Sequence, residues 1–138
     1  MITKILVPTD GSVFSRKASK LAIDIAKAAG AEVVAVHVIE VKPPKLLEGA
    51  DIEKLKSKQA DVCFRDFEEE AKKSGVAFDS RMLVSRSVSK TIIEYIDAES
   101  PDIVVMGSKG LTGLKKIMMG SVTTAVLEKT AVPLLVVK

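Results

Sequence analysis

Five short apolar runs, separated by longer segments with helical spacing, constrain the fold of this chain more than any other feature. The runs occupy residues 3–7, 32–39, 79–84, 102–106 and 133–137. They are rich in isoleucine, leucine and valine, and all but the weaker third run are nearly continuous. Strands of this kind are buried on both faces. The pattern therefore predicts a parallel sheet that lies between two layers of helices.

The segments between the runs predict four helices. In the first, apolar residues recur at three- and four-residue spacing, Ser12 is suited to cap the N-terminus, and Gly30 is suited to end the helix. The others are predicted at 51–74, 89–98 and 121–130. The order βαβαβαβαβ predicts an α/β fold, a three-layer doubly wound (Rossmann-like) domain with five parallel strands and right-handed crossovers. Residues 40–50 are expected to form either a lid or a plain surface connection.

Length and composition agree with one folded domain that covers residues 1–138. The apolar share is 47% and the charged share is 28%, with 21 Lys and Arg against 18 Asp and Glu, a formal net charge of +3. Intrinsic disorder is excluded because the apolar content is high and the net charge is small. A chain of this length can bury a sizeable core without a disulfide or a metal ion.

Composition also excludes several classes of function. The single cysteine cannot form a disulfide framework, which fits a reducing compartment. The chain has no apolar run long enough to span a membrane, and no signal peptide is expected, because the first apolar stretch ends at Pro8. We therefore expect a cytoplasmic protein that is not bound to membranes. Nucleic acid is not an expected partner, because the positive excess is small and aromatic residues for stacking are scarce.

Two loops are placed to form a ligand site. In an open doubly wound sheet, ligands bind beyond the carboxyl ends of the strands, where the strand order reverses. One loop, 8–12, follows the first strand, and the other, 107–113, follows the fourth and leads to residues 120–123. If these two strands are neighbours, both loops face the same crevice.

The second loop predicts an anion site. Gly107, Gly110 and Gly113 recur every three residues, so the backbone is free to take positive φ values, to approach a ligand closely and to form a concavity of N–H groups. Gly120 and Ser121 begin the last helix, whose N-terminus attracts anions. The remaining donors and cations expected here are Thr123, Lys109, Lys115 and Lys116. Together these groups suit a polyphosphate, whereas an isolated pair of glycines would indicate only a flexible turn.

Two common nucleotide motifs are absent. A P-loop requires glycine five positions after Gly107, where this chain has Thr112, and the dinucleotide fingerprint does not follow the first strand. The same loop nevertheless resembles that of the universal stress proteins. Their ATP-binding branch carries Gly, two residues, Gly, nine residues, Gly and then Ser or Thr, as at 107, 110, 120 and 121. The opening ILVPTDGS, the VHV of 36–38 and the final PLLVV extend the likeness over nearly the whole chain.

The resemblance implies roles for individual residues. Asp10 would contact the ribose or a phosphate-bound Mg²⁺, while Val38 would meet the adenine through its backbone. Pro8, Thr9 and Met106 would line the nucleoside pocket. Residues implied in the phosphate cradle are Gly107, Ser108, Lys109, Gly110, Gly113, Gly120, Ser121, Val122 and Thr123. The implied cofactors are ATP and Mg²⁺, the metal held mainly by the phosphates. From the residues alone, Asp10 has a second interpretation as an acidic residue favoured by a helix N-terminus.

The resemblance further implies a homodimer through strand 133–137, which we expect at a sheet edge. The leading functional hypothesis is an ATP-binding stress-response or regulatory protein. The alternatives are a slow nucleotide-hydrolysing enzyme and a ligand-free, chaperone-like interaction module. No positioned general base is recognisable, so we expect no enzyme, or at most very slow hydrolysis. The chain departs from the family at 86–88, where Arg-Ser-Val replaces the usual Gly, one residue and often Pro.

The remaining chemically reactive residues are expected to be structural. His37 is the only histidine and lies on a strand, without a recognisable catalytic partner. Cys63 shares a helical face with Phe67 and Ala71, which indicates a small core residue. With one histidine and one cysteine available, a metal centre built from protein ligands is not expected.

Overall fold

The computed structural model describes residues 1–42, 49–109 and 119–138. Strands and helices alternate along these residues, as the apolar runs predict. In chain order the elements are β1 (Lys4–Pro8), α1 (Val13–Ala29), β2 (Glu32–Glu40), α2 (Gly49–Lys73), β3 (Phe78–Ser85), α3 (Val88–Glu99), β4 (Ile103–Gly107), α4 (Ser121–Lys129) and β5 (Leu134–Val137). Every predicted strand and helix is present, and its ends differ only slightly from the predicted ends.

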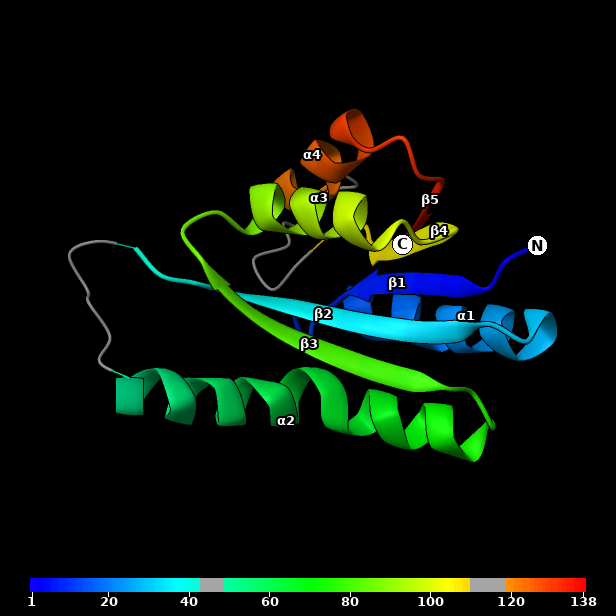
Figure 1. Cartoon of the computed structure of the whole chain (residues 1–138), viewed down its shortest axis with the longest axis horizontal. Coiled ribbons are helices and arrows are strands. Elements are labelled where there is room, and N and C mark those ends of the chain that lie inside the picture. The colour runs from blue at the N-terminus through cyan, green and yellow to red at the C-terminus, as the bar shows by residue number, and fades with distance from the viewer. Residues whose placement is uncertain (43–48, 110–118) are drawn as a thin grey trace.

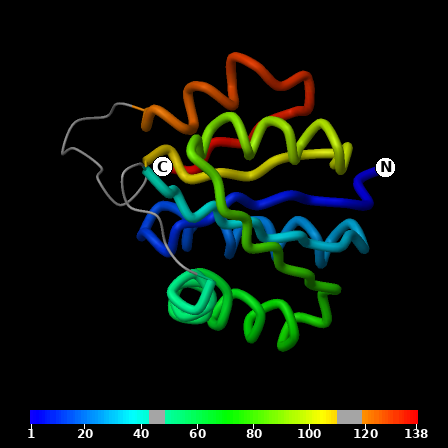
Figure 2. Tube along the Cα trace, turned by 60° about the vertical axis from the view of Figure 1, so that its left-hand side comes forward, coloured from blue at the N-terminus to red at the C-terminus, as the bar shows by residue number. Residues whose placement is uncertain are grey.

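The strands form one sheet in which all neighbouring pairs are parallel and the order is β3-β2-β1-β4-β5. Helices α1 and α2 pack on one face, and α3 and α4 on the other (Figure 1). Figure 2 shows the same layers from a second direction. From β1 the chain adds β2 and β3 on one side, then crosses to β4 and β5 on the other. The expected three-layer, doubly wound fold is therefore confirmed.

Each face of the sheet has its own apolar core. On one face, the small side chains of α1, among them Ala18, Ala22 and Ala26, let this helix lie close to the strands. The same core includes Cys63, Phe64, Phe67 and Ala71 of α2. On the other face, Ile92 and Ile96 of α3 and Val126 of α4 cover Leu6, Val34, Val36 and Val104. Alternate residues of each central strand enter opposite cores, which explains why these strands are apolar throughout.

Helix α1 begins and ends where its capping residues predict. The Ser12 side chain accepts a hydrogen bond from the backbone N–H of Ser15, and Gly30 takes the left-handed conformation at the other end. These caps satisfy backbone groups that the helix cannot pair internally. The position of α1 is important for the site, because the loop that precedes it follows β1 directly.

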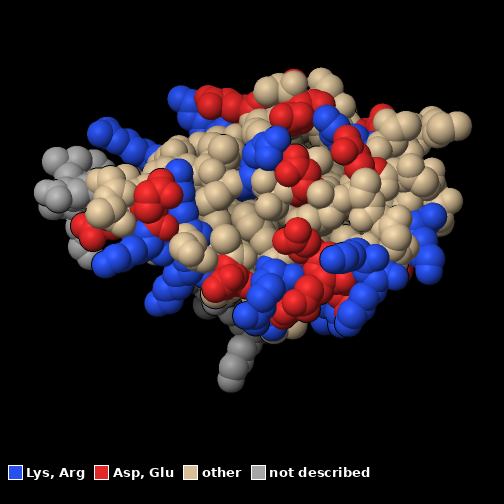
Figure 3. Space-filling view, turned by 60° about the horizontal axis from the view of Figure 1, so that its bottom comes forward, with Lys and Arg blue, Asp and Glu red and all other residues tan. Residues whose placement is uncertain are grey.

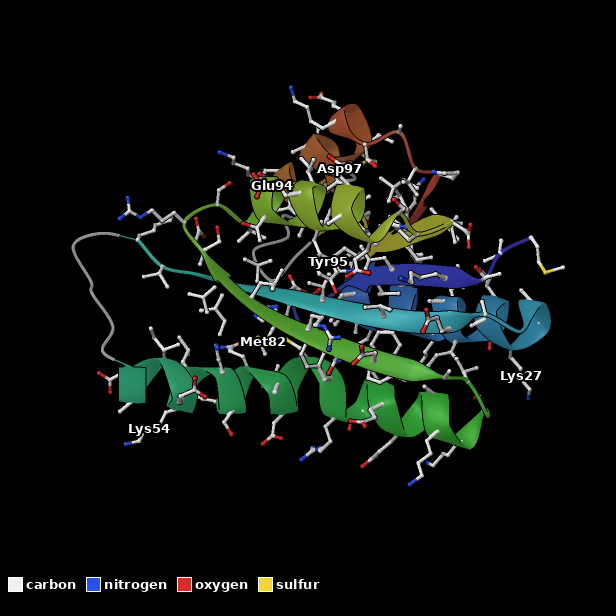
Figure 4. The ribbon with its side chains drawn as sticks, viewed as in Figure 1. Lys27, Lys54, Met82, Glu94, Tyr95 and Asp97 are labelled. Atoms are coloured by element: carbon white, nitrogen blue, oxygen red, sulfur yellow. The ribbon has the colours of Figure 1, made fainter. Side chains whose placement is uncertain are left out.

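Charged side chains of both signs are mixed on the side that includes α2. Figure 3 shows Lys and Arg interspersed with Asp and Glu on this side. In Figure 4, Lys54 points from α2 away from the sheet. A nucleic-acid-binding face would instead gather positive charge. Among the residues that the structure describes, no helix has the length and hydropathy needed to cross a membrane.

The two edge strands differ in character. Strand β3 carries an exposed ion pair between Arg81 Nη2 and Asp79 Oδ2 at 3.1 Å, and charged side chains discourage an edge strand from pairing with another chain. Strand β5 is the opposite edge, as predicted, and its sequence LLVV has no charge. Of the two edge strands in the part of the chain that the structure describes, β5 is the one that is wholly apolar.

Asp102 joins the amino ends of the two central strands. Its Oδ2 accepts hydrogen bonds from the backbone N–H groups of Thr3 (2.7 Å) and Lys4 (2.9 Å) and from the Thr3 hydroxyl (3.0 Å). In return, the Asp102 N–H donates to the Lys4 carbonyl at 3.0 Å. The backbone bonds from Thr3 and Lys4, followed by the Thr3 hydroxyl, hold the pKa of this carboxyl below its usual value. The carboxylate thus fixes β4 beside β1.

We expect Asp102→Asn to lower the urea midpoint at neutral pH, and we expect its difference from the wild type to close in acid. Because the folded-state pKa is lowered, the charged form stabilises the fold above the unfolded-state pKa of about 3.9. This contribution is lost as the pH falls through the folded-state pKa. Urea titrations across the acid range measure it. Asp97→Asn, which alters an exposed residue on α3 (Figure 4), is the matched control. A difference that persisted in strong acid would contradict this role.

Candidate functional site

The strand order reverses between β1 and β4, which pair directly at Ile5↔Ile103 and Leu6↔Val104. The sequence analysis predicted that the loops after these strands face one crevice if the strands are neighbours, and the structure shows that they are. Beyond the carboxyl ends of these strands lies a cavity of about 510 Å³. It is therefore at the place where doubly wound sheets bind ligands.

Most of the predicted site residues line this cavity. They are Pro8, Thr9, Asp10, Val38, Met106, Gly107, Lys109, Gly120, Ser121, Val122 and Thr123. Gly110 and Gly113 lie outside the described residues, as do Lys115 and Lys116. Ser108 is buried and is not among the lining residues. The structure thus brings together residues from β1, β2, β4 and the start of α4.

Thr9 fixes the loop after β1 through its polar groups. Its N–H donates to Val36 O at 2.9 Å, and its carbonyl oxygen lies 2.7 Å from His37 Nδ1. Its hydroxyl donates to Ser15 Oγ at 3.2 Å and accepts from Gly11 N at 3.4 Å. Thr9 is only 6% exposed, so these bonds replace the water that the buried groups have lost. The loop is consequently tied both to β2 and to α1.

Asp10 is held at the cavity by a tight turn. Its Oδ1 accepts a hydrogen bond from the Ser12 N–H at 2.9 Å, and Ser12 itself is the helix cap. Gly11 has φ +79°, and a Cβ on it would lie 2.7 Å from Val62 Cγ1 of α2. Glycine is needed here both for the left-handed backbone and for the close approach of α2. Asp10 therefore precedes the cap and faces the cavity instead of serving as the cap itself.

Gly107 does not use the freedom to take a positive φ that glycine offers. Of the described glycines, only Gly11, Gly30 and Gly75 have positive φ. Gly107 ends β4 in extended conformation, and a Cβ there would lie 2.7 Å from the carbonyl carbon of Phe14 in α1. The reason for glycine is thus the close packing of α1 on β4. This contact brings the start of α1 beside the loop after β4.

The start of α4 differs from the predicted cradle in two respects. Gly120 has φ −63° and ψ 157°, and its N–H donates to Ser108 O at 2.7 Å. The Thr123 hydroxyl, expected to face a ligand, donates instead to Gly107 O at 2.9 Å. Both groups satisfy main-chain carbonyls at the buried end of β4, which would otherwise lack partners. They therefore anchor α4 to the sheet and are not free to bind an anion.

The N–H groups of Ser121, Val122 and Thr123 form the first turn of α4. The first N–H groups of a helix have no acceptor within it, and Gly120 provides no side-chain cap. All three residues line the cavity, so the positive end of the helix dipole faces it. Ser108 has a supporting position, since its N–H donates to Val137 O at 2.8 Å and its carbonyl accepts from Gly120.

Charge in the cavity is concentrated at its rim. Lys109 is the lysine among the described lining residues, and its Nζ lies 5.8 Å from the centroid of the Phe14 ring. Asp10 and Glu40 are the carboxylates that line the same cavity. A ligand with phosphate groups would therefore meet both a cation and carboxylates in this cavity.

Sequence reasoning missed a second group of lining residues, which come mainly from β2, α2 and α3. They are Ser15, Val36, His37, Ile39, Glu40, Leu55, Gln59, Val88 and Ile92. Gln59 occupies the inward face of α2, between Leu55 and Cys63 at four-residue spacing. A polar residue at a position that the helical period assigns to the core was the available signal. The apolar members give the cavity a wall suited to a flat ring system.

The loop at residues 86–88, which departs from the family pattern, does not bring the charge of Arg86 to the cavity. Arg86 is exposed and does not line the cavity, whereas Val88 does. Hydroxyl groups close this loop, with Ser85 Oγ accepting from Ser87 N at 3.2 Å and from Thr91 Oγ1 at 2.6 Å. Ser87 caps α3 by accepting from Lys90 N. Serine and threonine side chains thus stabilise a turn that contains no glycine.

Cys63 is buried, as its helical face predicts. Burial, with a smaller contribution from the negative charge of Asp10, raises the pKa of its thiol to about 12. The thiol is thus protonated and unreactive at neutral pH. Within residues 1–42, 49–109 and 119–138, no cluster of three or more His, Cys, Asp or Glu residues could hold a metal ion.

Fold and cavity together define a doubly wound domain with a cavity at its switch point. The model of the universal stress protein family matches residues 1–138. Universal stress protein MJ0531 of Methanocaldococcus jannaschii is 36% identical over 139 residues, which cover 98% of this chain and 81% of that protein. The chain therefore belongs to the universal stress protein family.

Solved structures agree with this assignment. Protein MJ0577 of M. jannaschii superposes with a TM-score of 0.84 and 31% identity, covering 100% of this chain and 96% of that one. A universal stress protein solved in complex with cAMP has a TM-score of 0.75 and 23% identity, covering 99% of this chain and 97% of that one. The second likeness shows the shared fold alone.

We expect Gly107→Ala to destabilise the protein by about 1–3 kcal/mol, because the new methyl group would overlap the backbone of Phe14. Urea denaturation measures the loss. Gly49→Ala is the matched control, because a Cβ at Gly49 meets no atom within 4 Å. Equal midpoints for Gly107→Ala and the wild type would refute the packing explanation.

Proposed function

We propose that this protein binds ATP with Mg²⁺ and acts as a stress-response regulator that senses or signals through the bound nucleotide. The observation that carries the proposal is the first turn of α4, whose residues line a cavity at the switch point of the sheet and whose N–H groups have no acceptor within the helix. A helix N-terminus in that position favours phosphate groups.

The two kinds of cavity wall suit the two parts of a nucleotide. Val36, Val38 and Met106 lie on the α3–α4 side of the sheet, where Ile92 completes an apolar wall that fits an adenine ring. In this proposal, Pro8 and Thr9 border the nucleoside, and Val38 meets the base through its backbone. The phosphates extend toward Ser121, Val122 and Thr123, with Gly107 and Lys109 beside them, and the family resemblance adds Gly110 and Gly113 to the proposed contacts.

The carboxylate of Asp10 is the reason why the proposed ligand includes a cation. A carboxylate at the cavity repels phosphate unless a cation lies between them, and Mg²⁺ typically joins one or two carboxylates to substrate phosphates. The Ser12 N–H donates to Asp10 Oδ1, which orients the carboxylate. Asp10 would thus bind the ribose or the metal, which the phosphates mainly hold.

Structural neighbours support an adenine nucleotide as the ligand. Universal stress proteins have been solved with cAMP, with AMP in a protein from Arabidopsis thaliana, and with dAMP in one from Archaeoglobus fulgidus. These ligands share adenine, a sugar and phosphate. We extend that chemistry to ATP because the first turn of α4 and Lys109 offer several donors along one wall.

We favour a regulatory role over catalysis, and the hydrogen bonds of His37 and Asp10 bear on this choice. His37 Nδ1 pairs with Thr9 O, and Asp10 Oδ1 accepts from Ser12 N, so one polar atom of each side chain holds the loop after β1. The sequence offers no recognisable positioned general base, so we expect turnover below about one per second, the low end of usual enzyme rates. A buried free thiol at Cys63 fits a reducing cytoplasmic setting.

Ser121→Pro tests the role of the helix amides. Proline suits the first position of a helix, and the extended backbone of Gly120 accepts a following proline, so the fold should survive while one N–H is lost. We expect Mg²⁺–ATP affinity, measured by calorimetry, to fall by about tenfold or more, the range for a lost hydrogen bond to a charged group. Ser121→Ala, which keeps the N–H, is the control and should bind more tightly than Ser121→Pro.

The wild-type titration uses ATP, ADP, AMP and cAMP, each with and without Mg²⁺. Binding of none of them would refute the proposed function. Binding of cAMP or AMP in preference to ATP would assign the site to a monophosphate. Phosphate release sustained well above one per second would favour the enzyme alternative.

We also propose that the protein is a homodimer in which β5 strands pair across a two-fold axis. Strand β5 is a free, apolar edge, and such edges tend to acquire a partner strand. The Pro133 carbonyl accepts from Val104 N of β4, and the Val137 carbonyl accepts from Ser108 N, directly after β4. Main-chain groups point to alternate sides along a strand, so those of Leu134 and Val136 face outward.

Val136→Pro tests the dimer. It removes an outward N–H without removing a bond to β4, and proline is tolerated on edge strands. We expect light scattering at micromolar concentration to give a dimer for the wild type and a monomer for this variant. Val136→Thr keeps the N–H and should remain dimeric. A monomeric wild type would contradict the proposal.

A further inference from the structure

His37 makes a directed hydrogen bond within the candidate site. It lies on β2, its ring lines the cavity, and its Nδ1 is 2.7 Å from the carbonyl oxygen of Thr9. A carbonyl oxygen can only accept, so Nδ1 carries the proton and the ring is the donor. The bond therefore has one direction whatever the charge of the ring.

This bond continues the β1–β2 pairing beyond the point where the strands separate. The last paired positions are Pro8 and Val36, and the Thr9 N–H still donates to Val36 O. Past that point the backbones diverge, and the His37 side chain takes the next acceptor, Thr9 O. The imidazole thus replaces a main-chain donor at the end of the ladder.

The Thr9 carbonyl belongs to the peptide group that leads into Asp10. Because a peptide group is planar, fixing the direction of this carbonyl also fixes the N–H of Asp10 and the point from which its side chain departs. The downstream side of the same turn is held by the bond from Ser12 N to Asp10 Oδ1. Asp10 is therefore held from both sides, by β2 through His37 and by α1 through Ser12.

We propose that His37 is a positioning residue of the nucleotide site, which aims Asp10 at the Mg²⁺–nucleotide by orienting the Thr9–Asp10 peptide group. The inference rests on the proposed function, and it adds a residue that acts through Asp10 without contacting the nucleotide. It also explains why a lone histidine interrupts the apolar run of β2.

Amide substitutions separate the two nitrogens of the ring. In His37→Asn the side-chain NH₂ lies near the Nδ1 position and keeps a donor for Thr9 O. In His37→Gln the amide reaches toward the Nε2 position, and His37→Leu has no donor. We expect the Asn variant to bind Mg²⁺–ATP nearly as well as the wild type. The Gln and Leu variants should bind about three- to tenfold more weakly, the range for one lost hydrogen bond.

A double-mutant cycle with Asp10→Asn distinguishes positioning from general structural support. If His37 acts through Asp10, then His37→Leu should cost little affinity in the Asp10→Asn background, because the carboxylate that it orients is already lost. A loss of stability alone would weaken binding equally in both backgrounds. Met82→Leu is the matched control, since Met82 is the register partner of His37 on β3 and packs on the α1–α2 core (Figure 4).

Calorimetry with Mg²⁺–ATP gives the affinities, and urea midpoints report folding for every variant. Equal affinity losses from His37→Leu in both backgrounds would overturn the proposal, as would a Leu variant that binds like the wild type. The wild-type titration is the separate check on the proposed function. If the wild type binds and the cycle is additive, only the role of His37 fails, whereas a wild type that does not bind ends both.

Discussion

The pairing of β1 with β4 is the constraint from which the site follows. These strands are far apart in the sequence, and only two residue pairs join them directly. At the amino end, the Asp102 carboxylate receives two backbone N–H groups of the first strand. At the carboxyl end, the absence of a side chain on Gly107 lets α1 lie against β4. Both contacts keep β1 and β4 side by side. The loops after these parallel strands therefore meet at the carboxyl end of the sheet, where the cavity lies.

Many polar groups around the cavity are already hydrogen-bonded to other groups of the protein. Thr9 is bonded to Val36, His37 and Ser15, and the Thr123 hydroxyl closes on the end of β4. Such bonding rigidifies a site, because each buried donor or acceptor is costly to leave unpaired. The first N–H groups of α4 have no acceptor within the helix, and their residues line the cavity. A preorganised site of this kind loses little entropy when a ligand binds.

The fold could be predicted from sequence because its signals are local and consistent. Buried parallel strands are continuously apolar, and Ser12 and Gly30 mark the ends of α1. The site was predicted less completely, since its residues come together only in three dimensions. The role of Gly107 could not be predicted, because the atoms it accommodates belong to Phe14, far away in sequence. Thr123 was assigned to the ligand because a hydroxyl near a helix start gives no sign that a strand carbonyl will use it. Leu55 and Gln59 were missed because α2 reaches the cavity only when it packs on the sheet.

Ser108 lies between the two regions for which a function is proposed, the start of α4 and the edge strand β5. Its N–H is bonded to Val137 on the edge strand, and its carbonyl is bonded to Gly120 at the start of α4. Ser108 therefore links α4, which lines the cavity, to β5, the strand at the edge of the sheet. A shift of α4 must either break a bond of 2.7 Å or carry Ser108, and with it the edge strand, in the same direction. Ser108 thus couples movement at the cavity to movement at the edge of the sheet.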